Sequence, residues 1–463
     1  MEFLNSKKGL AIVGIVVGLL IASLAFFGNP ANMAICAACF IRDVAGALKL
    51  HEAAPVQYFR PEIVGFVAGA FIISIATKEY RSTAGSSPMV RFILGFIMMI
   101  GALIFLGYPL RMVIRMAAGD LNAWVGLIGL IAGIATGAVF LKKGFSLGRE
   151  SDTGKLSGAV LPIVLVVLLI IGVTTSLFAA STDGPGSKHA PVLIALVVTL
   201  VIGIVAQKTR ICFVGGVRNL ILMKDFTLLV PIIGIFVVML IYSLATDSFK
   251  LSFDGQPIAH SQQLWNILGL YAVGFAGTLA GGCPLRQMIL AGQGSSDAAM
   301  TFVGMLVGAA FAHNFGLAGA AAKAATETEA AVAGGPSEAG QIVLVCCIVV
   351  LFVIAAASLR RKKKAATKPA TDSGSQANAA YYDDWKTQAE KRGSTMQEVD
   401  ARGLSCPEPA LMAMEAMNDY PDEEIRVLVS AAVQKQNVTE IAQKKGRQVT
   451  ATQEGADFVL VIK

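Results

Sequence analysis

Long apolar runs alternate with short polar segments through most of the chain. Each run holds about twenty residues, the length of helix that spans the ~30 Å hydrocarbon core of a bilayer. We predict ten membrane-spanning helices, at residues 10–27, 60–77, 91–107, 122–141, 157–180, 190–207, 226–246, 264–282, 298–316 and 339–359. The first run lacks a convincing signal-peptidase site, so we interpret it as a retained span. The pattern therefore predicts an all-α polytopic membrane protein.

Four polar segments that contain glycine or proline interrupt this pattern. They are residues 29–50, 107–119, 208–222 and 282–294. Glycine and proline break helices, and irregular backbone at membrane depth is tolerated where it is buried in protein or lines a water-filled cavity. We therefore predict four re-entrant half-helices that enter the membrane and turn back.

The membrane part contains an internal repeat. "ICAACFIRDV" at 35–44 matches "ICFVGGVRNL" at 211–220, and "GYPLR" matches a later "GCPLR" at nearly the same separation. Five predicted crossings lie between equivalent points, and because five is odd, the two copies face opposite ways. An inverted repeat with broken helices is typical of transporters whose site lies near the bilayer midplane. The predicted parts are a first repeat (1–150), a connecting helix and loop (151–189), an inverted second repeat (190–320) and a last helix (321–360).

The chain has a net charge of +7, and its basic residues cluster at the ends of the predicted spans. This distribution indicates membrane topology rather than a nucleic-acid-binding face. Lys and Arg gather at alternate span ends, finishing with the basic run 360–364. The predicted outer loops carry one basic residue each, namely Lys188, Lys250 and Lys323. An excess of Lys and Arg marks cytoplasmic loops, so we expect an inner-membrane protein with both termini in the cytoplasm and no nucleic-acid partner.

The C-terminal part has the sequence pattern of a soluble domain. Residues 361–394 form a predicted linker, with a short helix around Tyr381–Lys391. From 395 to 463, strand and helix periodicities alternate as βαβαββ, which predicts a small α/β sandwich.

Four of the seven cysteines lie on the predicted half-helices, each with an arginine nearby. The predicted substrate path consists of Cys36, Cys39, Arg42, Tyr108, Arg111, Cys212, Arg218, Cys283 and Arg286, with Tyr108 where the repeat would place a cysteine. Buried arginines and helix N-termini favour anions, and a thiol suits a soft sulfur or selenium atom. The odd number of cysteines in apolar segments disfavours a disulfide scaffold.

Other interpretations of these polar residues stay open. "CAAC" also fits a redox CxxC or half of a zinc site, although we expect no metal and no cofactor. We interpret Asp43, Glu62 and Asp120 as counter-ions for arginine. Packing is the simpler role for a second group: Cys346, Cys347, His313 and Asn314.

In the tail, Cys406 precedes Pro407 at the predicted start of a helix. The free backbone N–H groups there favour a thiolate, as in a cysteine that carries a persulfide. The alternative is a buried structural cysteine.

"GLSCPEP", Gly403 to Pro409, resembles the signature of the TusA/SirA sulfur-carrier family, which implies that Cys406 carries a persulfide. Residues of about 8–360 resemble the YeeE/YedE sulfur-transport family. The segments "NPANMAICAACFIRDVAGALKLH", "VQYFRPEIVGF" and "GCPLRQMILAGQGSSDA" resemble its selenium-metabolism YedE branch. This resemblance implies an hourglass transporter that passes thiosulfate or a related compound inward past its cysteines.

We therefore expect an importer of a small reduced sulfur or selenium anion, fused to a cytoplasmic carrier and serving cytoplasmic sulfur- or selenium-transfer proteins. The alternative is a membrane-anchored sulfurtransferase in which only Cys406 is chemically active. A metal transporter is disfavoured, because the chain has four histidines and many arginines along the path. No Walker-type phosphate loop occurs, which argues against direct ATP coupling.

Overall fold

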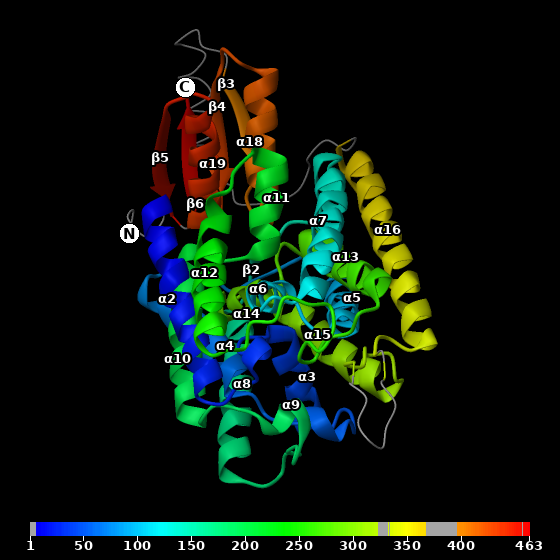
Figure 1. Cartoon of the computed structure of the whole chain (residues 1–463). Coiled ribbons are helices and arrows are strands. Elements are labelled where there is room, and N and C mark those ends of the chain that lie inside the picture. The colour runs from blue at the N-terminus through cyan, green and yellow to red at the C-terminus, as the bar shows by residue number, and fades with distance from the viewer. Residues whose placement is uncertain (1–5, 323–331, 333, 367–395, 456) are drawn as a thin grey trace. The chain divides into compact units, whose positions relative to one another are not determined.

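The computed structural model describes residues 6–322, 332, 334–366, 396–455 and 457–463 (Figure 1). These residues form two compact units, one of residues 1–140 and 152–355 and one of residues 141–151 and 356–463. Lys323 and the predicted helix around Tyr381–Lys391 lie outside the described residues.

The ten predicted spans are confirmed as apolar helices. Ten candidate membrane spans occur in the described part of the chain. The long helices are α2 (Lys7–Phe26), α4 (Pro61–Ala76), α5 (Pro88–Phe105), α7 (Leu121–Lys142), α8 (Lys155–Thr174), α10 (Val192–Thr209), α12 (Val230–Ala245), α13 (Gln263–Ala280), α15 (Ser296–Asn314) and α16 (Glu338–Ala366).

A short helix lies in each of the four predicted interruptions. These helices are α3 (Ala37–Ala47), α6 (Pro109–Ala117), α11 (Phe213–Met223) and α14 (Pro284–Gln293). Before α6, α11 and α14 the preceding long helix ends at a left-handed residue: Leu106, Arg210 or Gly281, with φ of 60°, 58° and 88°. Ten helical residues rise about 15 Å, half of a hydrocarbon core. Their lengths suit half-helices, and their re-entry from one membrane face stays a prediction.

The long helices pack in pairs that mirror the sequence repeat. Helix α4 packs along α10, and α12 packs along α2. In the predicted repeat, α4 is equivalent to α12 and α2 is equivalent to α10. The contact of α4 with α10 is therefore the counterpart, under the repeat, of the contact of α12 with α2. Figure 1 shows α3 and α11, which are also equivalent, toward opposite ends of this bundle. The domain boundaries themselves stay predictions.

Helices α7 and α13 touch backbone to backbone along a row of glycines. A Cβ on Gly129 would lie 2.0 Å from the Ile267 carbonyl oxygen, and one on Gly133 would lie 2.1 Å from that of Tyr271. Small residues at such spacing let membrane helices approach closely enough for dispersion to hold them together.

We expect Gly129→Val to lower the free energy of unfolding by about 1–3 kcal/mol, because the two helices must separate to admit the side chain. Thermal unfolding of the detergent-solubilised protein measures this. The control is Ile128→Val on the same helix turn, where the side chain is 63% exposed. Equal Tm values for the two variants would contradict close packing of α7 on α13.

The C-terminal part of the second unit has the predicted βαβαββ order. Its elements are β3 (Met396–Asp400), α18 (Glu408–Asp419), β4 (Glu424–Val429), α19 (Ala432–Lys444), β5 (Val449–Glu454) and β6 (Asp457–Ile462). The sheet order is β3-β4-β6-β5, with β3 parallel to β4 and the other neighbours antiparallel. Ile425, Val427 and Leu460 are fully buried between this sheet and its helices.

Candidate functional site

The four short helices of the membrane part begin at the residues singled out from the sequence. Cys36, Tyr108, Cys212 and Cys283 are the N-cap residues of α3, α6, α11 and α14. Each N-cap position adjoins backbone N–H groups at the positive end of a helix dipole, where negative charge is stabilised. The repeat therefore places a thiol or a phenol at the N-cap of each of these four short helices.

Two of these tips meet directly. The sulfur atoms of Cys212 and Cys283 lie 3.5 Å apart, and both side chains are buried. The Cys212 sulfur also accepts hydrogen bonds from the Gly215 and Cys283 amides at 3.3 and 3.5 Å. N–H donors of this kind favour negative charge on the Cys212 sulfur.

Tyr108 connects the two copies of the repeat. Its side chain is fully buried, and its hydroxyl has no hydrogen-bond partner of normal geometry among the described residues. The electrostatic neighbours of this hydroxyl are Cys283, Cys212 and the backbone amide of Ala37. Tyr108 therefore interacts electrostatically with the paired thiols and with the tip of α3.

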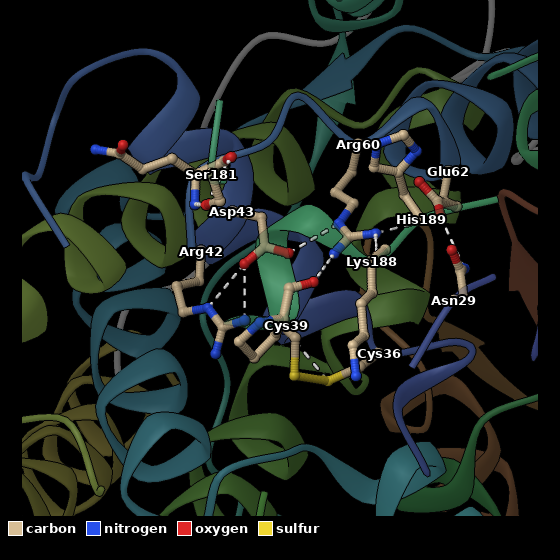
Figure 2. Close-up of polar contacts among 12 residues, drawn as sticks. Asn29, Cys36, Cys39, Arg42, Asp43, Arg60, Glu62, Ser181, Lys188 and His189 are labelled. Carbon is tan, nitrogen blue, oxygen red and sulfur yellow. Dashed lines mark hydrogen bonds and ion pairs between the residues drawn. A yellow bond between two sulfur atoms is a disulfide. The ribbon is translucent and has the colours of Figure 1, made fainter. Parts of the chain in front are cut away.

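Cys36 and Cys39 form a disulfide, with Cα atoms 5.1 Å apart (Figure 2). This corrects the expectation that both residues offer free thiols to the path, although the open CxxC alternative anticipated it. The Cys36 sulfur accepts a hydrogen bond from the Cys39 amide at 3.3 Å. A pair spaced by one helical turn can close in this way because its two side chains share one helix face.

Arg111 is a buried arginine that forms no ion pair with a carboxylate among the described residues. Its Nη1 lies 3.6 Å from the Cys39 sulfur, and its side chain is fully buried. Its remaining N–H groups donate to neutral acceptors: the carbonyl and side-chain oxygens of Asn32 and the carbonyls of Leu106 and Ile258. In the part of the chain that the structure describes, no Asp or Glu pairs with it. The guanidinium therefore lies beside Cys39 without a direct ion pair, and the carboxylates of Asp43 and Asp120 act on it only at longer range.

Arg42 belongs to a neutral cluster instead (Figure 2). Its Nε and Nη2 donate to one oxygen of Asp43, at 2.9 and 2.7 Å. The other Asp43 oxygen accepts from Arg60 at 2.8 Å, and Glu62 lies 3.9 Å from Arg60. Asn29 donates to Glu62 at 2.9 Å. Two positive and two negative groups cancel, so the interpretation of Asp43 and Glu62 as counter-ions is confirmed.

Sequence reasoning missed Arg60, which organises the cluster and also binds the loop carbonyls of Pro185 and Lys188 at 2.9 and 3.1 Å. Its signal was the position directly before Pro61, where a helix begins. Arg115, also missed, pairs with Asp120 at 2.6 Å, so Asp120 is a counter-ion too.

The remaining candidates are placed as follows. Arg218 and Arg286 are buried on α11 and α14, and Arg218 lies 3.4 Å from the Asn219 side-chain oxygen. His313 packs against the His51 ring with centroids 4.7 Å apart, and Asn314 donates to the Leu50 carbonyl at 2.9 Å. Packing roles for these last two stay predictions, since Asn314 is exposed and His313 Nε2 is buried without a hydrogen-bond partner among the described residues.

Cys346 and Cys347 lie on α16, and both are free thiols. Cys346 is exposed and Cys347 is buried. Neither is bonded to a path residue in the described part of the chain.

In the second unit, Cys406 is a half-buried cysteine outside any disulfide, and it directly precedes Pro407, the N-cap residue of α18. The side-chain amide of Asn437, on α19, donates to its sulfur at 3.8 Å. Asn437 was not anticipated, because only the fold brings α19 to this position. The thiol is therefore accessible and stands at a helix start, as predicted for a carrier cysteine.

The segment before Cys406 is fixed by polar contacts within the same unit. Arg402 pairs with Asp400 at 3.0 Å, and Arg149 lies 3.4 Å from the Asp400 carboxylate. Burial raises the pKa of the Asp400 carboxyl, but hydrogen bonds from Arg402 outweigh this and hold that pKa below its ordinary value. The Glu150 amide donates to the Gly403 carbonyl at 2.6 Å.

Comparison with known families gives two matches. Residues 208–390 match the family described as "Sulphur transport", and residues 397–463 match "Sulfurtransferase TusA". No curated protein sequence matches the chain significantly. With its ten apolar helices the chain is a multi-pass membrane protein. The two matches, together with these helices, support a sulfur transporter joined to a TusA-type sulfur-carrier domain.

Proposed function

We propose that the protein imports a small reduced sulfur anion, such as thiosulfate, across the inner membrane past the four half-helix tips. The observation that carries this is the contact between the N-cap thiols of Cys212 and Cys283, which interact electrostatically with the N-cap Tyr108. Arg111 follows Tyr108 on α6 and has no carboxylate ion-pair partner among the described residues. Helix N-termini and a guanidinium stabilise an anion, and thiols contact a soft terminal sulfur. A selenium anion of the same shape is the competing substrate.

Each repeat packs its helices against helices of the other repeat, in the pairs α4 with α10 and α12 with α2. This arrangement supports two half-sites, one from each repeat, that face each other near the bilayer midplane. Arg218 and Arg286 would face the substrate on the second repeat, as Arg111 does on the first. Arg42 would act through the cluster that holds α3, since Asp43 already neutralises its charge. With both termini cytoplasmic, Cys406 would accept or handle the imported sulfur and pass it to cytoplasmic transfer proteins.

Uptake of labelled thiosulfate and selenite into cells without other routes tests this proposal. We expect Cys283→Ala and Cys212→Ala each to lower uptake by about tenfold or more, because loss of a contact to a charged ligand costs about 1.5–3 kcal/mol. The matched control is Cys346→Ala, an exposed thiol away from the tips. Undiminished uptake in both path variants would remove the thiol path.

The second candidate is a membrane-anchored sulfurtransferase, favoured by the half-buried Cys406, which is in no disulfide and lies near a helix start. In that case Cys406→Ser would abolish function, and the detached residues 396–463 would restore it fully without the membrane part. Uptake that persists in Cys406→Ser vesicles while downstream sulfur transfer stops would instead support an importer with a separate carrier.

A further inference from the structure

The half-helix tips hold two cysteine pairs in different chemical states. Cys36 and Cys39 are joined as a disulfide within α3. Cys212 and Cys283 are free thiols that belong to two different short helices. The second pair thus consists of two neighbouring cysteines, as the first does, but lacks the disulfide bond.

The geometry of the second pair is close to that of a bond. Its sulfurs lie 3.5 Å apart, and a disulfide needs about 2.05 Å, so the tips must approach by about 1.5 Å. Gly215 follows Cys212 by three residues and donates its amide to the Cys212 sulfur at 3.3 Å. Bond formation requires the tips of α11 and α14 to move closer by about 1.5 Å.

The same environment prepares one sulfur to react. The Cys212 sulfur accepts two backbone N–H groups and sits at a helix N-terminus, both of which favour the thiolate. Cys283 supplies the second thiol at contact distance. A thiolate with a neighbouring resolving cysteine is the arrangement of a redox-sensitive site.

We propose that Cys212 and Cys283 form a reversible disulfide, a redox modification site that ties the tips of α11 and α14 together and withdraws both thiols from the path. The oxidant is a hydroperoxide. The Cys212 thiolate attacks one peroxide oxygen, the O–O bond breaks, and water leaves after protonation, giving a sulfenic acid. The Cys283 thiol then attacks that sulfur, forming the S–S bond and releasing a second water. Two thiols and one hydrogen peroxide give one disulfide and two waters, and a dithiol reductant reverses the step.

Peptide mapping tests the bond directly. The full-length Cys406→Ser chain, which lacks the accessible carrier thiol, is reduced, oxidised with hydrogen peroxide, and denatured in N-ethylmaleimide before digestion without reductant. We expect a linked peptide pair containing residues 212 and 283, lost in Cys283→Ser and unchanged in Cys346→Ser. The Cys36–Cys39 disulfide, re-formed in the same sample, is the internal positive control. Maleimide on both Cys212 and Cys283 after oxidation, with Cys36–Cys39 re-formed, would overturn the inference.

The effect on transport rests on the proposed function and is read separately. In vesicles, peroxide should reduce sulfur-anion uptake in proportion to the linked fraction, and dithiothreitol should restore it. Linkage with unchanged uptake would overturn passage of substrate between these tips while leaving the redox site standing. Absence of linkage overturns the redox site whatever the uptake.

Discussion

Replacing Arg111 with glutamine should reduce sulfur-anion uptake by about 30-fold or more while leaving the fold largely intact. Removing one partner of a buried charge contact costs about 2–5 kcal/mol, which corresponds to that loss of affinity. Arg111 is a buried guanidinium that forms no ion pair with a carboxylate among the described residues, so its removal strands no paired acid. Initial uptake rates in vesicles measure the effect.

Two companion variants separate charge from structure. Arg111→Lys keeps the charge and should retain more uptake than glutamine. Arg115→Gln strands Asp120, with which it pairs at 2.6 Å, and should lower Tm more than Arg111→Gln does. If Arg111→Gln unfolds the protein as readily as Arg115→Gln, Arg111 is structural and its assignment to the path is wrong.

Replacing Asp43 with asparagine should destabilise the membrane part by about 3–5 kcal/mol, the usual cost of breaking a buried ion pair by removing one partner. Asp43 is fully buried and holds Arg42 and Arg60 with its two oxygens (Figure 2). Its loss leaves a net positive charge in a cluster that is otherwise neutral. Thermal unfolding in detergent measures the change.

A double variant tests whether charge balance causes the loss of stability. Asp43→Asn with Arg42→Gln removes one charge of each sign, so part of the lost stability should return. Asp254→Asn, at an exposed loop position, is the control and should change Tm little. A double variant less stable than Asp43→Asn alone would show that charge balance does not govern the cluster.

The sequence predicted the helices and their breaks because both depend on local composition. In a bilayer, a run of about twenty apolar residues satisfies its backbone hydrogen bonds by forming a helix, and glycine or proline ends that helix. This is why all ten spans and the short helices α3, α6, α11 and α14 lie where the pattern put them. The βαβαββ order of the tail followed in the same way from strand and helix periods.

The partners of the charged and sulfur-containing side chains did not follow from the pattern. Arg42 and Arg111 look alike in sequence, yet one is neutralised by Asp43 and the other meets only neutral oxygens and a sulfur. Arg60 and Asn437 reach their sites from helices whose packing no local signal reports.

By itself, therefore, the sequence placed Cys36, Tyr108, Cys212 and Cys283 on the interrupted segments and Cys406 near a helix start. Only the tertiary structure decided that the first four are N-cap residues. It also decided that Cys36 bonds to Cys39, that Cys212 lies against Cys283, and that Arg111 meets neutral oxygens and a sulfur. The physical reason is range: backbone hydrogen bonding and hydrophobicity act along the chain, whereas charge compensation and sulfur contacts depend on atoms that folding brings together from distant segments.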